Sequence, residues 1–187
     1  MTEVIDEIFE LFRRFGGDGY GEDLSLERHM LQSAAMAQSQ GAPDPLIVAA
    51  LLHDIGYFVA ADLALSNNAA HSRHVGADHE FIGADWLARA FGEAVTGPIA
   101  LHVDAKRYLC HRDPGYQSRL SDASRTSLAV QGVPMTDTDA AVFTTHPAFE
   151  DALHLRLWDD GGKHLDAAVP SLDAFRGLLQ STCRQQA

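Results

Sequence analysis

One segment constrains the fold of this chain more than any other: a nearly all-apolar run that ends in an adjacent histidine and aspartate. Asp44-Pro45 has the order of a helix N-cap followed by proline at the first helical position, and residues 46–52 continue without a polar side chain. A helix that is apolar on every side lies in the interior, so it carries His53 and Asp54 there. An unpaired buried aspartate is costly, whereas coordination of a metal cation offsets its desolvation.

Three further histidines and a late aspartate pair join this segment in one series. The members of the series are His29, His53, Asp54, His79, His102, Asp159 and Asp160. A lone histidine on a helix is more often a core or surface group than a ligand, but the combination of several with a buried aspartate indicates a metal site. Imidazole nitrogens together with a carboxylate that can bridge suit iron, manganese and other borderline ions. We therefore expect a two-metal site.

The composition bounds the class of protein and its partners. With 187 residues, 46% of them hydrophobic, the chain can bury one sizeable core, and we expect a single domain over residues 1–187. Its 26 acidic residues outnumber its 14 basic residues, for a net charge of -12. That charge repels nucleic acids and anionic membrane surfaces, so neither is expected as a partner. An anionic substrate must then enter through a locally positive pocket.

Targeting features and cysteine usage favour the cytoplasm. The chain opens on an acidic amphipathic stretch at residues 2–14, and it shows neither a signal-peptide pattern nor the run of about 18 apolar residues that a membrane span needs. Cys110 and Cys183 are too few and too unpatterned for a disulfide framework, which fits a reducing compartment. We therefore expect a cytoplasmic protein.

Apolar periodicity and helix punctuation predict an all-α bundle. No convincing alternating strand appears, and glycines and prolines mark the expected helix ends. The predicted helices cover residues 2–14, a segment from 23 or 25 to 41, then 44–52, 77–91, 93–108 with an interruption at Gly97-Pro98, 116–130, 137–143, 148–158 and 171–185. Residues 62–76 have no clear period, and we expect a long loop there.

The order His, His-Asp, Asp resembles the HD-domain superfamily, in which it defines a helical metallophosphohydrolase core with a buried dinuclear metal site. Here the order reads His29, His53-Asp54, Asp159. Other segments narrow the resemblance, namely residues 102–109, 121–124, 131–132, 134–135 and 156–160. They look like the HD-domain mixed-valence diiron oxygenases that cleave organophosphonates, the PhnZ-like group. The likeness defines a core from about residue 22 to 170, followed by a C-terminal helix at about 171–185.

The resemblance implies how the series divides between two iron ions, Fe(II) and Fe(III). One iron would be held by His29, His53, Asp54 and Asp159, and the other by Asp54, His79 and His102. Asp54 would bridge the two ions. A nitrogen-rich set with an open position on each iron suits the binding of substrate and O2 side by side. The preference for Asp159 over its neighbour rests on the resemblance alone.

The same likeness implies four substrate-binding residues. They are Lys106, Ser124, Ser127 and Gln131. Lys106 stands one helical turn after His102, on the same side, where its cation would meet a phosphonate. Ser124, Ser127 and Gln131 follow spacings of three and four residues and share one helical face. From spacing alone, the alternatives are a lysine that extends to solvent and a polar stripe that faces water.

Three aromatic or acidic side chains complete the implied site. Glu22 and Tyr20 correspond to a gate at the open iron position, although Tyr20 is one residue displaced from the family's tyrosine and is otherwise a packed aromatic. Tyr57 stands where better-known relatives carry a pocket histidine. Its aromatic face either attracts a quaternary ammonium group or packs in the core. Arg156 either supports the metal ligands from behind or is a surface charge, and it is left outside the site.

The resemblance implies an oxygenase that uses two iron ions and O2 to cleave the carbon–phosphorus bond of a 1-hydroxy-2-aminoethylphosphonate, N-trimethylated or not. The products would be phosphate and glycine or glycine betaine. The alternative is an HD-type metal-dependent phosphohydrolase acting on nucleotides or phosphate monoesters. A non-catalytic HD-like sensor is a third reading, but it would be expected to lose ligands. The second nitrogen-rich site formed by His79 and His102 favours the oxygenase.

Overall fold

The computed structural model describes residues 2–19, 24–66 and 75–183, which form helices joined by short connections. The helices are α1 (Thr2–Phe15), α2 (Leu26–Ser39), α3 (Asp44–Leu52), α4 (Ile55–Ser66), α5 (Val75–Leu87), α6 (Glu93–Arg112), α7 (Tyr116–Arg119), α8 (Asp122–Gln131), α9 (Asp137–Phe143), α10 (Phe149–Gly161), the 3-10 helix η1 (Leu172–Phe175) and α11 (Arg176–Thr182). Within these ranges the β-type pairing is limited to an isolated bridge between Gly19 and Ser25. The all-α prediction is confirmed.

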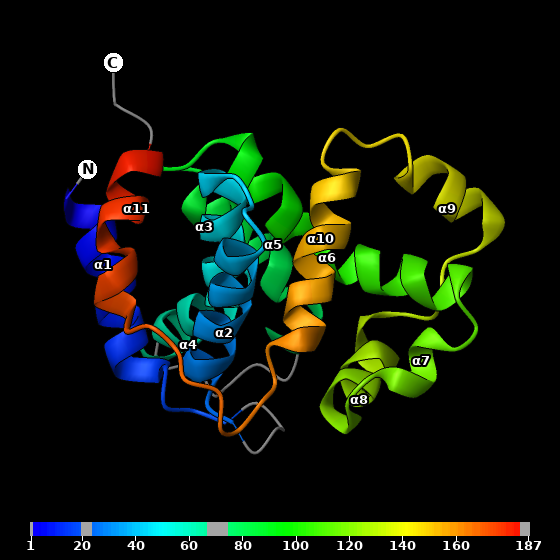
Figure 1. Ribbon diagram of the computed structural model, residues 1–187, viewed down its shortest axis with the longest axis horizontal. Helices are drawn as coiled ribbons and strands as arrows, with labels where there is room; N and C mark the ends of the chain where they lie inside the picture. Colours follow the sequence, from blue (N-terminus) through cyan, green and yellow to red (C-terminus); the bar gives the residue numbers. More distant parts are fainter. Residues whose placement is uncertain (1, 20–23, 67–74, 184–187) are drawn as a thin grey trace.

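The apolar helix α3 lies at the centre of the arrangement. Its residues from Leu46 to Leu52 are all buried, and it packs against α2, α6, α10 and α11 (Figure 1). His53 and Asp54 form the turn that leads from α3 into α4, and both are buried. The predicted buried helix end is therefore present. The N-cap residue is Pro43, one position earlier than predicted, because Asp44 already lies in the first turn.

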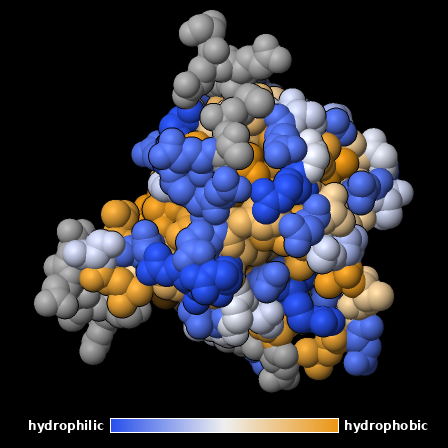
Figure 2. All heavy atoms as spheres, turned by 90° about the vertical axis from the view of Figure 1, so that its left-hand side faces the viewer, coloured by the Kyte–Doolittle hydropathy of each residue, from blue (hydrophilic) through white to orange (hydrophobic). Residues whose placement is uncertain are grey.

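Helices from the two ends of the chain close one side of the core. α1 and α11 lie side by side, and the guanidinium of Arg176 on α11 lies 3.7 Å from the centroid of the Phe9 ring on α1. The adjoining face of α1 buries Ile5, Ile8 and Phe12. Figure 2 views this side, where hydrophilic side chains surround smaller apolar areas. On the far side of the core, α7, α8 and α9 extend beyond α6 and α10.

Helix α4 corrects the prediction of a loop that begins at residue 62. It continues to Ser66, while residues 67–74 of the expected loop lie outside the described residues. Leu63 and Leu65 at its end are exposed, so no apolar period marks this turn of helix in the sequence. Packing specifies it instead, since the Phe58 ring meets the Phe12 ring of α1 edge-on at 5.2 Å. In the described part no single helix is long and apolar enough to cross a membrane. The bent pair α3 and α4 meets these criteria of length and composition only when the two helices are taken together.

Two other helix boundaries differ from prediction. Helix α6 continues through Pro98 without the expected interruption, because a proline near the helix start removes only one backbone hydrogen bond and packing compensates for it. The predicted helix at 116–130 is two helices, since Leu120 adopts an extended conformation at ψ 146. Ser121 then caps α8 by accepting a hydrogen bond from the Ser124 amide at 3.1 Å.

Close contact between α4 and α5 places His79 and depends on a glycine. A Cβ added at Gly56 would lie 1.9 Å from the His79 carbonyl oxygen and 2.9 Å from the Gly83 nitrogen, so the backbones would have to separate. We expect Gly56→Ala to lower the free energy of unfolding by about 3 kcal/mol, the upper end of overpacking costs. Denaturant unfolding measures this change. Gly17→Ala is the control, since its Cβ would meet no atom within 4 Å; equal stability of the two variants would contradict this account.

Candidate metal centre

Five separate parts of the fold deliver the six side chains of the predicted metal series to one place. α2 carries His29, the turn after α3 carries His53 and Asp54, α5 carries His79, α6 carries His102 and α10 carries Asp159. All six are at most 5% exposed. The structure thus brings together every residue that the sequence assigns to the two-metal site.

The first cluster gathers around His29. Its Nε2 lies 3.1 Å from His53 Nε2, 3.2 Å from Asp159 Oδ1 and 3.7 Å from Asp54 Oδ2. His53 Nε2 lies 3.4 Å from the same Asp54 oxygen. His29, His53 and Asp54 offer ligand atoms that all lie within 4.8 Å of one another, a separation that can hold a metal ion.

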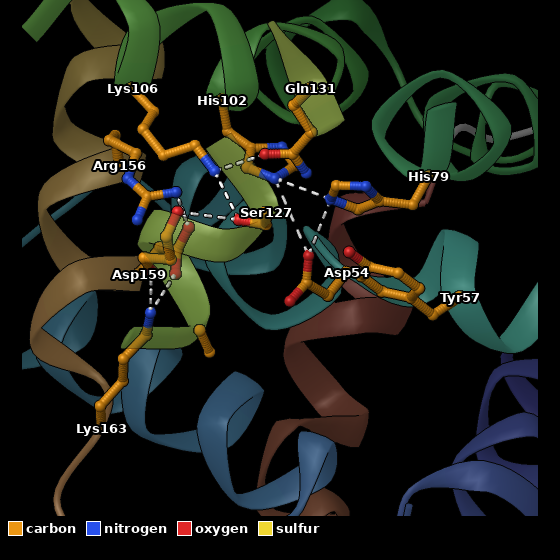
Figure 3. A pocket seen from close by; sticks show the side chains of 12 residues that line it. Asp54, Tyr57, His79, His102, Lys106, Ser127, Gln131, Arg156, Asp159 and Lys163 are labelled. Atoms are coloured by element: carbon orange, nitrogen blue, oxygen red, sulfur yellow. Dashed lines mark hydrogen bonds and ion pairs between the residues drawn. The ribbon is translucent and has the colours of Figure 1, made fainter. Parts of the chain in front are cut away.

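The second cluster uses the other oxygen of the same carboxylate. Asp54 Oδ1 lies 3.1 Å from His79 Nε2 and 3.8 Å from His102 Nε2 (Figure 3). The two imidazole nitrogens are themselves 3.1 Å apart. Asp54 therefore faces one histidine pair with Oδ2 and the other with Oδ1, which is the geometry of a bridging ligand between two metal ions.

The ring tautomers show that the first cluster fits a cation. Nδ1 of His29 lies 2.9 Å from the carbonyl oxygen of Gly162, and Nδ1 of His53 lies 2.9 Å from that of Ala50. A carbonyl only accepts, so each ring carries its proton on Nδ1 and leaves a lone pair on Nε2. Two lone pairs that face each other at 3.1 Å repel unless a cation accepts both. The donor set, mixed nitrogen and oxygen, suits iron or another borderline metal.

Burial and charge keep these groups in their ligand forms. Burial lowers the pKa of His53 and of His102, so both imidazoles stay neutral. Burial alone would raise the pKa of Asp54, but a proton on His53 or His79 outweighs it and holds that pKa below its ordinary value, so the carboxyl group ionises before these imidazoles lose their protons. Burial likewise opposes ionisation of Asp159, and Arg156 overcomes it, so the pKa of Asp159 is well below its usual range. Metal ligands must be deprotonated, and these are.

A pocket lies against the second cluster. Its lining consists of Asp54, Tyr57, His79, His102, Lys106, Ala123, Ser124, Ser127, Gln131, Arg156, Asp159 and Lys163. Lys106 is 2% exposed, so it does not extend to solvent, and its Nζ donates to Ser127 Oγ at 2.9 Å and to Gln131 Oε1. The alternative of a polar stripe facing water is also wrong, because all three residues of the α8 face line this pocket. Their contact with substrate stays a prediction.

Two cationic residues of this pocket were missed from the sequence. Arg156 is 3% exposed and pairs with Asp159 Oδ2 at 2.5 Å and with Asp160. The prediction that placed it outside the site was therefore wrong about its location. Its spacing of three and four residues from the two aspartates could have indicated this. Lys163 donates to Ser124 Oγ at 2.6 Å and lies 3.9 Å from Asp159 Oδ1. Nothing in the local sequence around Lys163 marks this role.

Of the remaining predicted site residues, the structure describes Asp160 and Tyr57 but not Tyr20 and Glu22. Asp160 accepts a hydrogen bond from the Tyr116 hydroxyl and turns toward Arg156, which supports Asp159 as the ligand. Tyr57 lines the pocket and stacks on His79 with ring centroids 4.3 Å apart. The predicted gate, Tyr20 and Glu22, lies outside the described residues.

The sequence was compared with protein families and with known proteins. The HD domain profile matches residues 26–129. Hydroxymethylphosphonate dioxygenase from Gimesia maris is 41% identical over 96% of this chain and 88% of its own length. A [1-hydroxy-2-(trimethylamino)ethyl]phosphonate dioxygenase (glycine-betaine-forming) from Leisingera caerulea is 37% identical over 95% of this chain and 89% of its own length.

The chain is therefore an HD-domain protein. Within that class it belongs to the family of phosphonate-cleaving HD oxygenases, the PhnZ-like group, as its sequence motifs predicted.

Occupation of the two clusters should stabilise the fold, because metal binding relieves the facing lone pairs and the buried carboxylate. At a free metal concentration about 100 times the Kd, we expect a gain of about 2.7 kcal/mol in the free energy of unfolding for each occupied site. Thermal unfolding of the chelator-treated protein, with and without anaerobic Fe2+ or Co2+, measures the gain. Asp54→Ala should abolish it, whereas His111→Ala, which changes a histidine paired with exposed Asp137, should retain it. A wild-type protein insensitive to both metal and chelator would refute the site.

Proposed function

We propose that this protein is an iron-dependent oxygenase that cleaves the carbon–phosphorus bond of a 1-hydroxyalkylphosphonate with O2. One observation carries the proposal: a single buried carboxylate, Asp54, faces two histidine pairs beneath a pocket lined by cationic side chains. The sequence relation to two named phosphonate dioxygenases supports the same activity.

The substrate class follows from what the two relatives' names share. Each names a phosphonate whose phosphorus-bearing carbon also carries a hydroxyl group, and they differ in the substituent on that carbon. The phosphonate and the hydroxyl can both bind metal, so the shared part is the part that a two-metal site orients. The substituent is hydrogen in one name and a trimethylaminomethyl group in the other. A 1-hydroxy-2-aminoethylphosphonate belongs to the same class.

The pocket wall supplies the charge that a phosphonate needs. Lys106, Arg156 and Lys163 line it, in a chain whose net charge is -12. These three cations face two carboxylates in the same lining, Asp54 and Asp159, and this balance supports the predicted locally positive pocket. Hydrogen-bond donors on α8 stand beside the cations, since Ser124 contacts Lys163 and Ser127 contacts Lys106. A phosphonate that replaced these internal contacts would gain charge-assisted hydrogen bonds in a site largely shielded from water.

The reaction balances with one O2 per substrate. For hydroxymethylphosphonate, the carbon–phosphorus bond breaks, the carbon is oxidised to formate and phosphorus leaves as phosphate. For the aminoethyl substrates the corresponding carboxylate is glycine or glycine betaine. An Fe(II)/Fe(III) pair supplies the Lewis acidity and the electron needed to activate O2 when it is bound.

The residues of this chain divide the remaining work. Asp54 would hold both metals, together with His29 and His53 on one side and His79 and His102 on the other. Lys106 would offset the phosphonate charge as the bond breaks, because Ser127 and Gln131 already hold its cation in the pocket before substrate binds. Tyr57 packs against the ring of His79 and excludes water from that side.

The deciding experiment measures phosphate release from three substrates with iron-loaded protein. These are hydroxymethylphosphonate, 1-hydroxy-2-aminoethylphosphonate and its N-trimethylated form, mixed under nitrogen and then exposed to O2, with phosphorus NMR as the readout. We expect phosphate only after O2 is added. The ratio of the phosphate-release rates for the three substrates identifies the preferred substituent on the phosphorus-bearing carbon. His102→Ala should abolish release. Phosphate from nucleotides or phosphate monoesters under nitrogen, with none from the phosphonates, would instead establish the phosphohydrolase.

The charge on Lys106 should impose a pH limit on substrate capture. Burial, reinforced by Arg156, lowers the pKa of Lys106 to about 8. The amine is charged below that pKa, so kcat/KM should fall through about pH 8, approaching about tenfold per pH unit above it. In Lys106→Arg, whose guanidinium stays charged, this alkaline fall should disappear. Lys106→Met should lose about 1.5–3 kcal/mol of binding below that pKa, and the difference from wild type should shrink above it, where the wild-type amine is also uncharged. If kcat/KM of the Lys106→Arg variant fell above pH 8 as in wild type, the charge on Lys106 would not be the cause of the pH limit.

A further inference from the structure

Two buried polar atoms beside the second cluster have no aligned hydrogen-bond partner in the described part of the chain. They are Nδ1 of His79 and Oε2 of Glu80. The two residues are 2% and 3% exposed, and the two atoms lie 3.2 Å apart. That separation is a hydrogen-bond distance, and a small rotation of either side chain would align the pair. Each atom thus has a complementary partner within reach.

His79 differs in this respect from the other three histidines of the clusters. Nδ1 of His29, His53 and His102 each lies 2.7 to 2.9 Å from a backbone carbonyl oxygen. A carbonyl is neutral, whereas Glu80 places a carboxyl group behind the His79 ring. The second cluster therefore has a carboxyl-backed imidazole that the first cluster lacks among the described residues.

We propose that Glu80 is a positioning residue that orients His79 and sets the properties of the metal held by His79 and His102. Its carboxylate accepts the Nδ1 proton, which leaves the Nε2 lone pair directed at Asp54 Oδ1 and His102 Nε2, each 3.1 Å away. A carboxylate behind a ligating imidazole also raises the basicity of that imidazole and strengthens metal binding.

The same contact makes the two metal positions unequal. Negative charge behind His79 stabilises a more highly charged ion at the His79/His102 position. At the other position the charge of Asp159 is offset by its ion pair with Arg156, so Fe(III) is favoured beside His79 and Fe(II) at the other position. This consequence rests on the proposed diiron function. The effect on metal affinity does not, because any divalent ion held by His79 would be affected.

Metal titration tests the effect of Glu80 on metal affinity separately from the diiron function. Apoprotein is titrated with Co2+, whose visible bands and heat of binding report each site. We expect Glu80→Leu, which removes the acceptor, to weaken the second binding step about 10- to 100-fold. Glu80→Gln keeps an acceptor oxygen without the charge, so it should weaken that step less. Asp85→Asn is the matched control, because it removes an exposed carboxylate from the same helix and should bind as wild type. Wild-type affinity in both Glu80 variants would overturn the proposal.

Redox titration of the iron-loaded proteins tests the asymmetry. Electron paramagnetic resonance measures the fraction of mixed-valence pairs at a fixed potential. In Glu80→Gln this fraction should fall severalfold in favour of the fully reduced pair, with no change in Asp85→Asn. Equal mixed-valence fractions in all three proteins would overturn the assigned preference for Fe(III).

A measurement on the wild type removes any dependence on how the variants fold. In protein loaded with diamagnetic Zn2+, the Nδ1 proton of His79 should resonate downfield of those of His29, His53 and His102, because a carboxylate is a stronger acceptor than a carbonyl. A His79 proton upfield of the other three would refute the contact. Failure of the phosphonate assay alongside Glu80-dependent Co2+ binding would refute the diiron oxygenase and leave the positioning role intact.

Discussion

The buried carboxylate of Asp54 is the constraint on which the rest of the structure depends. It sits at the end of α3, whose apolar residues have no alternative to the interior, and four imidazoles surround it. A charge in that position is tolerable only with compensation from every side. Helices α2, α5 and α6 each contribute an imidazole that contacts Asp54, and α10 adds Asp159 beside His29, so the packing of the bundle and the assembly of the two clusters are one arrangement.

Polar contacts around the clusters form a second layer that prepares each group for its role. Backbone carbonyls set the tautomers of three histidines, Glu80 stands behind the fourth, and Arg156 holds Asp159 ionised. The lysines of the pocket are held in turn by serines and a glutamine of α8. A cationic pocket inside an acidic chain attracts an anion to one place while most of the surface repels it. That combination suits a small phosphonate.

The errors of sequence-based reasoning share a physical cause. The last turn of α4 carries exposed leucines and no apolar period, and its helix is stabilised by packing against α1 and α5. Helix α6 passes through Pro98 because neighbouring helices compensate for the lost hydrogen bond. Arg156 faces the pocket because of how α10 packs against α6, and the sequence shows its spacing from Asp159 and Asp160 but not which side of the helix faces the pocket.

By itself the sequence determined the fold class, the buried His53-Asp54 turn and the set of residues that could bind metal. These follow from the local hydrophobic pattern and from residue type, both of which the sequence contains. Only the tertiary structure decided which histidines pair, which oxygen of Asp54 faces each pair, and that Glu80 stands behind His79. Those relations join residues that are up to 48 positions apart, such as Asp54 and His102 at 3.8 Å. They depend on how helices rotate and approach when the core packs, and no local pattern encodes that.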